Sequence, residues 1–243
     1  MRLVSWNIRG GKHPDVVNSV VTLKPDVAVL VDCKAKHVDR IVADAAKHGY
    51  THHLENCGVY RGLVMLSRAP LSLGEIKPYK GSHRWLHGVS DHFRLEIAAV
   101  YSPLPKAYEG DPTMSEFWSW VISACDLIVD RQAVLCGDFN TGVDEADGPA
   151  RYHFRGANPF GELVAHGWKD AYRELHVDGE QRSWWWNRER GFRIDHCMLS
   201  RGQPAPSGVE YVQELAAIRT EPLPADGLKA AALPDHAALV VDF

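Results

Sequence analysis

An α/β fold with mixed sheets is the fold class that this sequence predicts. Apolar runs of strand length alternate with helical patterns near the N-terminus, whereas short strand candidates follow one another in the middle of the chain. The run 27–31 is aliphatic throughout, which is typical of a strand buried on both faces. Because 45% of the 243 residues are apolar and 24% are charged, the chain can bury a large core without disulfides.

The first half of the chain predicts two strand-helix units followed by antiparallel strands. The valines after position 13 recur at helical spacing until Pro25 ends the pattern. The expected elements are strand 3–8, helix 13–24, strand 27–31 and helix 37–48. Short strands separated by turn residues are then expected at 62–67, 71–76 and 95–101.

The second half predicts further helices and strands around a long polar loop that ends near residue 158. The expected elements are helix 113–130, strand 133–136, helix 160–166, strands 183–186 and 192–199, and a last strand from residue 238. The sequence contains no internal repeat and no abrupt shift in composition. We therefore expect one domain over residues 1–243.

The charge balance limits the class of partner. The chain has 27 Lys and Arg against 31 Asp and Glu, which gives a net charge of −4. A nucleic acid would therefore have to bind through a local basic patch or a bound cation.

The cysteines and the N-terminal sequence bear on the compartment. The cysteines contain no C-x-x-C pair and predict buried, reduced thiols in a cytoplasmic protein; they are Cys33, Cys57, Cys125, Cys136 and Cys197. No signal peptide is expected, because Gly10 and Gly11 interrupt the first apolar stretch. No membrane span is expected either, because Asp26 and Asp32 flank the longest aliphatic run, 27–31. We expect a monomer.

Polar residues recur where the predicted strands end, and α/β folds place their sites at strand ends. Each one alone is more simply read as a cap or turn residue, but their repetition points to a site. The residues are Asn7, Asp32, Asp138, Asn140, Asp195, Asp235 and His236. Four carboxylates brought together would repel one another without a cation, and oxygen ligands suit Mg²⁺ or Mn²⁺.

Zinc is the alternative metal, because the chain has 13 histidines. However, His83, His87 and His92 have no accompanying acidic motif, and the pair His52 and His53 falls in an expected loop. These histidines are therefore expected to have structural or solvent-facing roles.

Seven motifs follow one another along residues 1–243: MRLVSWNIRGG, PDVAVLVDCK, RGLVMLSRAPL, VYSPLP, LCGDFN, DAYRELH with SWWWNRERGFRIDHCMLS, and PDHAAL. In this order they resemble the endonuclease/exonuclease/phosphatase superfamily, and within it they are most similar to the exonuclease III and AP endonuclease branch. The resemblance implies a four-layer α/β sandwich, in which two mixed β-sheets pack face to face with helices outside.

The same resemblance implies a site for Mg²⁺ (or Mn²⁺) at Asn7, Asp32 and Asp235. The family usually has Glu where this chain has Asp32, and the shorter side chain favours contact through a metal-bound water. Tyr101 matches a tyrosine that contacts the phosphate or the leaving group. The asparagine usually found shortly after it is replaced here by Leu104.

The remaining catalytic roles also follow from the resemblance. Asp138 would position and deprotonate the attacking water, and Asn140 would contact the phosphate. His236 would contact the phosphoryl oxygens, with its imidazole oriented by Asp195. Such a set is suited to in-line hydrolysis of a phosphate ester.

The tryptophans of SWWW are the next informative feature. In a strand, Trp184 and Trp186 face one way and Trp185 faces the other, so at least one of these rings is expected in the core. In AP endonucleases, residues equivalent to Trp184, Phe192 and Ile194 line the pocket for an abasic sugar. The connection at 187–191 is shorter than the family's usual loop, which favours weaker distortion of a DNA duplex.

A local basic patch for phosphates is expected at Arg188, Arg190 and Arg193, with a solvated face as the alternative. The leading functional hypothesis is a DNA endonuclease or exonuclease of the abasic-site type. The alternative is a phosphoesterase acting on a lipid, sugar or nucleotide phosphate, which Leu104, Asp32 and the negative net charge favour. An inactive member that only binds nucleic acid is disfavoured, because the polar set at the strand ends is complete.

Overall fold

The computed structural model of the chain describes residues 1–104, 112–154, 159–187, 190–215, 218–219 and 235–243. Within these residues, the strands form two six-stranded sheets and two short hairpins. Both sheets are mixed. β1 (Arg2–Gly10) runs parallel to β2 (Val27–Cys33) in the first sheet, and β7 (Leu95–Tyr101) runs parallel to β8 (Ala133–Asp138) in the second.

The first sheet joins the two ends of the chain. Its other strands are β3 (His52–Cys57), β4 (Gly62–Ser67), β13 (Gly208–Val212) and β16 (Ala238–Asp242). Their order across the sheet is β13-β16-β1-β2-β4-β3. Leu3 of β1 lies opposite Val241 on one side and Val27 on the other, so the last strand completes the sheet beside the first.

The second sheet brings two of the predicted catalytic carboxylates together. Its other strands are β5 (Ser72–Leu73), β6 (Trp85–Ser90), β9 (Lys169–Asp170) and β12 (Asp195–Leu199). Their order is β5-β6-β7-β8-β12-β9. Because β12 pairs antiparallel with β8, Asp195, the first residue of β12, lies directly opposite Asp138, the last residue of β8.

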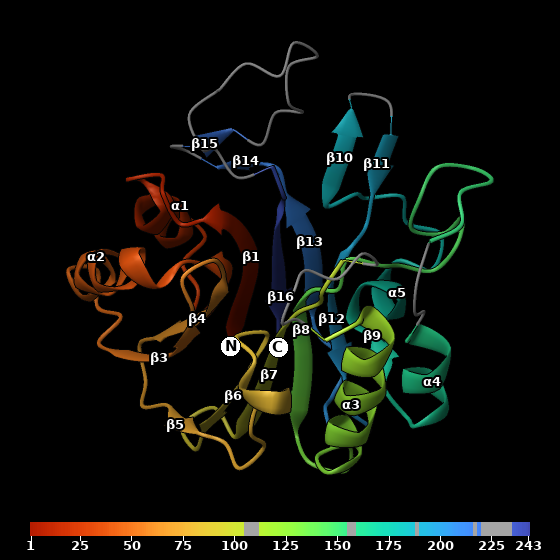
Figure 1. Ribbon diagram of the computed structural model, residues 1–243, viewed down its shortest axis with the longest axis horizontal. Helices are drawn as coiled ribbons and strands as arrows, with labels where there is room; N and C mark the ends of the chain where they lie inside the picture. The colour runs from red at the N-terminus through yellow and green to blue at the C-terminus, as the bar shows by residue number, and fades with distance from the viewer. Residues whose placement is uncertain (105–111, 155–158, 188–189, 216–217, 220–234) are drawn as a thin grey trace.

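Two hairpins stand outside the sheets. β10 (Trp184–Asn187) pairs with β11 (Arg190–Phe192), and Figure 1 shows this hairpin extending beyond the edge of the sheets. β14 (Glu214–Leu215) pairs with β15 (Ile218–Arg219).

Helices cover the outer face of each sheet (Figure 1), whereas Ala171 and Tyr172 of the last helix pack in the core between the two sheets. They are α1 (Val16–Thr22), α2 (Ala35–Ala46), α3 (Met114–Asp126), α4 (Phe160–Ala165) and α5 (Ala171–Leu175), with a 3-10 turn at Tyr79–Gly81. Apolar side chains of α1 and α2 pack on Trp6 and Leu30 of the first sheet, whereas α3 and α4 pack on the second. A capping box between Thr113 and Glu116 begins α3. In the described part of the chain, no helix is long and apolar enough to cross a membrane.

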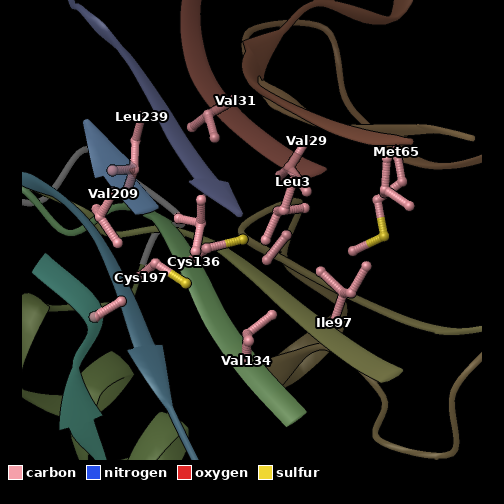
Figure 2. Close-up of a cluster of buried hydrophobic side chains, with 14 of the residues drawn as sticks. Leu3, Val29, Val31, Met65, Ile97, Val134, Cys136, Cys197, Val209 and Leu239 are labelled. Atoms are coloured by element: carbon pink, nitrogen blue, oxygen red, sulfur yellow. The ribbon is translucent and has the colours of Figure 1, made fainter. Parts of the chain in front are cut away.

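The central core lies between the two sheets (Figure 2). Leu3 and Val29 from the first sheet meet Ile97 and Val134 from the second, and all four are buried. Alternate residues of each strand point to this core and to the outer helices, which explains why β2 is apolar over residues 27–31. The order helix, sheet, sheet, helix confirms the predicted four-layer α/β sandwich.

Several local predictions were wrong. His52 and His53 were placed in a loop but begin β3, and β6 and β13 were not predicted at all. These strands carry His, Glu or Gly between their apolar residues, so no hydrophobic pattern marks them in the sequence. Pairing with neighbouring strands in the folded protein defines them instead. The strand expected at 71–76 is reduced to Ser72–Leu73. Cys57, expected to be buried, is half-exposed at the end of β3.

Candidate active site

The carboxyl ends of β1, β2, β7 and β8 meet at one edge of the sandwich, where a cavity of about 670 Å³ opens. Most of the predicted site residues line it, although they come from distant parts of the chain. They are Asn7, Asp32, Tyr101, Asp138, Asn140, Trp184, Arg190, Phe192, Ile194, Asp235 and His236. Asp195 lies behind His236 and contacts it directly.

Glycine at position 137 allows β8 to carry Asp138 to this edge. The backbone of Gly137 has a φ of +139°, and a Cβ atom there would lie 2.0 Å from the carbonyl oxygen of Val100 in β7. A side chain at this position would therefore push the two parallel strands apart. Asn140, just beyond the strand, has a φ of 50°, a conformation that asparagine adopts more readily than most residues.

Asp138 is buried and hydrogen-bonded on both carboxylate oxygens. Its Oδ2 accepts from Asn7 Nδ2 at 2.9 Å, and its Oδ1 accepts from the backbone N–H of Asn140 at 2.9 Å. Burial, reinforced by the nearby Asp195 carboxylate, raises the pKa of Asp138 to about 7. The carboxyl group is thus able to exchange a proton near neutral pH.

His236 forms a buried pair with Asp195, the two atoms Nδ1 and Oδ2 being 2.7 Å apart. Burial alone would lower the pKa of His236, but the Asp195 carboxylate outweighs it and raises the pKa to about 10. The imidazole is therefore a cation at neutral pH. Polar atoms of Asp138, Asp195 and His236 all lie within 4.8 Å of one another.

The backbone of Asp195 is held on both sides. Its N–H donates to Ser183 Oγ at 3.0 Å, and its carbonyl oxygen accepts from Tyr211 Oη at 2.6 Å. Ser183 also accepts from the N–H of Ile194, so one hydroxyl fixes two consecutive residues. This support orients the carboxylate toward His236 without using its oxygens.

Asn7, Asp32 and Asp235 form the acidic side of the cavity. Burial raises the pKa of Asp32, and the negative charge of Asp235 adds to this effect, whereas nearby cations such as Lys34 oppose it. Trp184 Nε1 donates to Asp235 Oδ2 at 3.3 Å. Two carboxylates and an amide oxygen are hard donors that fit Mg²⁺ or Mn²⁺.

Tyr101 and Asn140 lie beside this acidic side. Burial raises the pKa of the Tyr101 hydroxyl, as do the nearby carboxylates, so it stays protonated. Asn140 Nδ2 donates to the carbonyl oxygen of Ser102 at 2.8 Å, which fixes the orientation of its amide. Leu104 lines the cavity on the same side.

Aromatic rings form another part of the cavity lining. Trp184 lies 5.7 Å from Phe192 and 6.2 Å from Trp186, measured between ring centroids. Trp185 points the other way and packs against the central core, as the strand alternation predicted. Phe192 and Ile194 line the cavity but are only 5% and 7% exposed.

The three arginines of the predicted basic patch do not lie in the same environment. Arg190 is exposed and lines the cavity, whereas Arg188 lies outside the described residues. The prediction for Arg193 was wrong, because its guanidinium is fully buried and bonded to Asp147 at 2.7 Å and Asp170 at 2.6 Å. A side chain that neutralises two buried carboxylates does not contact a substrate phosphate.

Sequence reasoning missed four residues that line the cavity. Arg9 follows Asn7 by two positions in β1, so the strand alternation could have placed both on one side. Trp186 was expected to share a strand face with Trp184, but it was not predicted to belong to the site. Tyr152 and Phe154 lie in the polar loop after Asn140, where no local pattern marks them.

Comparison with known proteins shows the family of the chain. A model of the Endonuclease/Exonuclease/phosphatase family matches residues 4–218. The chain therefore belongs to the endonuclease/exonuclease/phosphatase family, as the ordered motifs predicted. No curated protein matches the sequence at a significant level.

Solved structures share the whole fold at low sequence identity. A 3′ phosphatase from Neisseria, NExo, bound to a product DNA hairpin, is 21% identical with a TM-score of 0.78, and a 3′-5′ exonuclease (NExo) from Neisseria meningitidis is 22% identical with a TM-score of 0.76. An AP endonuclease from Archaeoglobus fulgidus is 16% identical with a TM-score of 0.77. Each match covers 100% of this chain and 99% of the other. The names of these structures match the branch that the motifs predicted.

Proposed function

We propose that the chain is a metal-dependent phosphodiester hydrolase that acts on DNA, as an abasic-site endonuclease, an exonuclease or both. The cluster of Asp138, Asp195 and His236 in one cavity is the observation that supports this most strongly. It combines a carboxyl group that titrates near neutral pH with a cationic imidazole. The names of the structures that share the fold add support, because they describe enzymes acting on DNA.

The chain's own residues provide for both the attack and the developing charge. Asp138, with a pKa of about 7, accepts a proton from the attacking water. Because His236 Nδ1 is held by Asp195, Nε2 is the nitrogen that faces a phosphoryl oxygen and donates to it. Asn140 uses one amide N–H for Ser102, and its second N–H contacts the phosphate.

Asn7, Asp32 and Asp235 are the residues that we assign to Mg²⁺ (or Mn²⁺). When bound there, the cation supplies charge stabilisation to the phosphoryl group. Trp184 orients Asp235 by donating its indole N–H. Tyr101 stays protonated and is placed to donate to the phosphate or to the leaving oxygen.

A phosphoesterase acting on a lipid, sugar or nucleotide phosphate is the second candidate. Leu104 favours it, because an apolar side chain lies in the cavity where the family usually has an amide. An inactive, nucleic-acid-binding member is a weaker proposal, since the catalytic cluster is complete. A monomeric state and a cytoplasmic location stay predictions.

One assay separates these candidates. Purified protein with Mg²⁺ or Mn²⁺ is tested on intact duplex DNA, duplex DNA with an abasic site, single strands, and a set of phosphomonoesters. We expect cleavage of at least one DNA substrate and complete loss of activity with EDTA. Turnover of phosphomonoesters alone would favour the second candidate, and activity that survives EDTA would contradict the metal dependence.

A further inference from the structure

The aromatic surface that a substrate meets differs from the one that the motifs predicted. Phe192 is only 5% exposed because Tyr152 packs against it, with ring centroids 4.8 Å apart at an angle of 71°. Phe154 packs on the same two rings, at 5.2 Å from Tyr152 and 6.0 Å from Phe192. Tyr152 is 38% exposed and Trp186 is 71% exposed. The exposed rings are therefore Tyr152 and Trp186, while Trp184 and Phe154 are half-buried.

Tyr152 is fixed in place by its own segment. Its N–H donates to the carbonyl oxygen of Pro149 at 3.0 Å. Two residues later, the N–H of Phe154 donates to Asp144 Oδ1 at 2.8 Å. Gly148 leaves room for the ring, since a Cβ atom there would lie 3.3 Å from Tyr152 Cδ1. The ring is thus held at the cavity before any substrate binds.

The cavity joins this aromatic surface directly to the catalytic cluster. His236 and Asn140 line one part of it, and Tyr152 and Trp186 line another. A volume of about 670 Å³ lies within the range of cavities that enclose a drug-sized molecule, so it has room for more than a sugar. Exposed aromatic rings stack on any nucleobase, because every base has a π-face, whereas an abasic sugar has none.

We propose that the cavity binds a nucleotide that carries its base, and that Tyr152 and Trp186 recognise the base by stacking. This inference rests on the proposed function and narrows it, because it makes a base-bearing nucleotide the preferred substrate over an abasic sugar. Tyr152 is the specificity-determining residue. Trp184 and Phe192 are poor probes of this role, since Trp184 also holds Asp235 and Phe192 is covered.

Two small ligands test the proposal, because they differ at the C1 atom of the sugar, which carries a base in one and a hydroxyl group in the other. Deoxyadenosine 5′-monophosphate and deoxyribose 5-phosphate are titrated against the whole chain by calorimetry with Mg²⁺ present. We expect the nucleotide to bind about tenfold more tightly than the sugar phosphate. Tyr152→Leu keeps an apolar side chain against Phe192 but removes the π-face, so we expect the two ligands to bind this variant equally well. Tyr152→Phe keeps the ring, so we expect it to retain the difference in affinity.

Trp186→Leu provides a second variant, because its ring is exposed and its loss leaves the core intact. Tyr60→Leu is the matched control. Tyr60 is 74% exposed and lines a different cavity, so this change leaves the binding ratio unaltered. Equal affinity of the wild-type chain for the two ligands would overturn the proposal, and so would no binding of the nucleotide in the millimolar range.

A cleavage assay separates this proposal from the broader one. Two duplexes are compared that differ only in their 3′-terminal residue, which carries a base in one and is abasic in the other. We expect Tyr152→Leu to slow cleavage of the base-bearing end about tenfold and to spare the abasic end. Equal slowing of both ends would contradict base stacking. If the wild-type chain cleaves neither duplex, the proposed function fails and the binding ratio still decides the inference.

Discussion

Asp138 and His236 are close together, and their surroundings raise the pKa of both groups for different physical reasons. The pKa of Asp138 is raised to about 7 by burial, and that of His236 is raised to about 10 by Asp195. The site thus holds a group that accepts protons near neutral pH beside a group that remains cationic. This separation of roles matches what general base catalysis and charge stabilisation require.

Replacing either group is expected to reduce turnover strongly. Asp138→Asn removes the proton acceptor and His236→Ala removes the charge that faces the phosphate, so we expect kcat to fall by about 10²–10³-fold in each variant. Steady-state kinetics measure this, with circular dichroism to check the fold. Asp91→Asn, in an exposed turn, is the control. Turnover near the wild-type level in either variant would mean that the site is elsewhere.

The backbone conformation at position 32 favours aspartate over glutamate. The φ of 56° at Asp32 lies in the left-handed region, which aspartate tolerates better than glutamate. We expect Asp32→Glu to strengthen Mg²⁺ binding through its longer arm, while it lowers the free energy of unfolding by about 1 kcal/mol. Calorimetric titration measures the first effect and urea unfolding the second. Unchanged or weaker Mg²⁺ affinity would contradict the idea that the short arm limits contact.

His196 predicts a pH dependence of stability. Its Nε2 donates to the carbonyl oxygen of Thr141, and burial lowers its pKa from 6.5 to about 4. Below pH 6.5 the unfolded chain binds a proton that the folded chain does not. The contribution to stability is therefore complete above pH 6.5 and is lost as the pH falls toward 4.

We expect the free energy of unfolding to fall by up to about 1.4 kcal/mol per pH unit in this window, relative to His196→Gln. Urea unfolding of both proteins at several pH values between neutrality and pH 4.5 measures the difference. Parallel profiles for the wild type and the variant would show that His196 does not control this dependence.

At the scale of elements, a buried ion network joins the loop after β8 to the segment between β11 and β12. Arg193 bonds to Asp147 and Asp170, and Arg173 bonds to Asp147 at 2.8 Å. Asp147 also accepts from the N–H of Val143, which shapes the loop itself. Because this loop follows Asp138 and this segment precedes Asp195, the network helps to fix these two carboxylates, proposed as catalytic, relative to each other.

Breaking this network is expected to cost far more than breaking a surface pair. Arg193→Met leaves two buried carboxylates short of a partner, so we expect the free energy of unfolding to fall by about 3–5 kcal/mol. Arg201→Met removes an exposed pair with Asp130 of similar length and is expected to cost about 0–1 kcal/mol. Urea unfolding compares the two. A similar cost for both would show that burial of the network contributes nothing.

At the scale of the whole molecule, the proposed metal ligands come from the beginning and the end of the chain. Asn7 lies on β1, Asp32 on β2 and Asp235 just before β16, and only the folded first sheet brings them together. A cation held by all three binds the folded state and not the unfolded one. Metal binding is therefore coupled to folding.

Mg²⁺ is accordingly expected to stabilise the protein. At about 100 times its Kd the gain is about 2.7 kcal/mol, and EDTA reverses it. Thermal unfolding followed at increasing Mg²⁺ concentration measures the effect, and Asp235→Asn is expected to weaken it. A melting temperature that does not respond to Mg²⁺ would argue against a metal site formed by these residues.

The sequence alone determined the family, the α/β class and most of the residues that line the cavity. This was possible because the proposed catalytic residues lie in short motifs next to apolar strands, such as GDFN and RIDH, so their local signal is strong. Strands such as β3 and β13 could not be predicted, because their mixed composition shows no strand pattern. Hydrogen bonds to their pairing partners in the sheet define them.

Only the tertiary structure decided what two side chains, Arg193 and Tyr152, do. Arg193, which resembles a surface phosphate contact in RERGFRID, is buried because Asp147 and Asp170 converge on it from distant segments. Tyr152, in a polar loop without pattern, reaches the cavity because that loop folds back onto Phe192. Long-range contacts of this kind are made by residues far apart in sequence, so no local pattern records them.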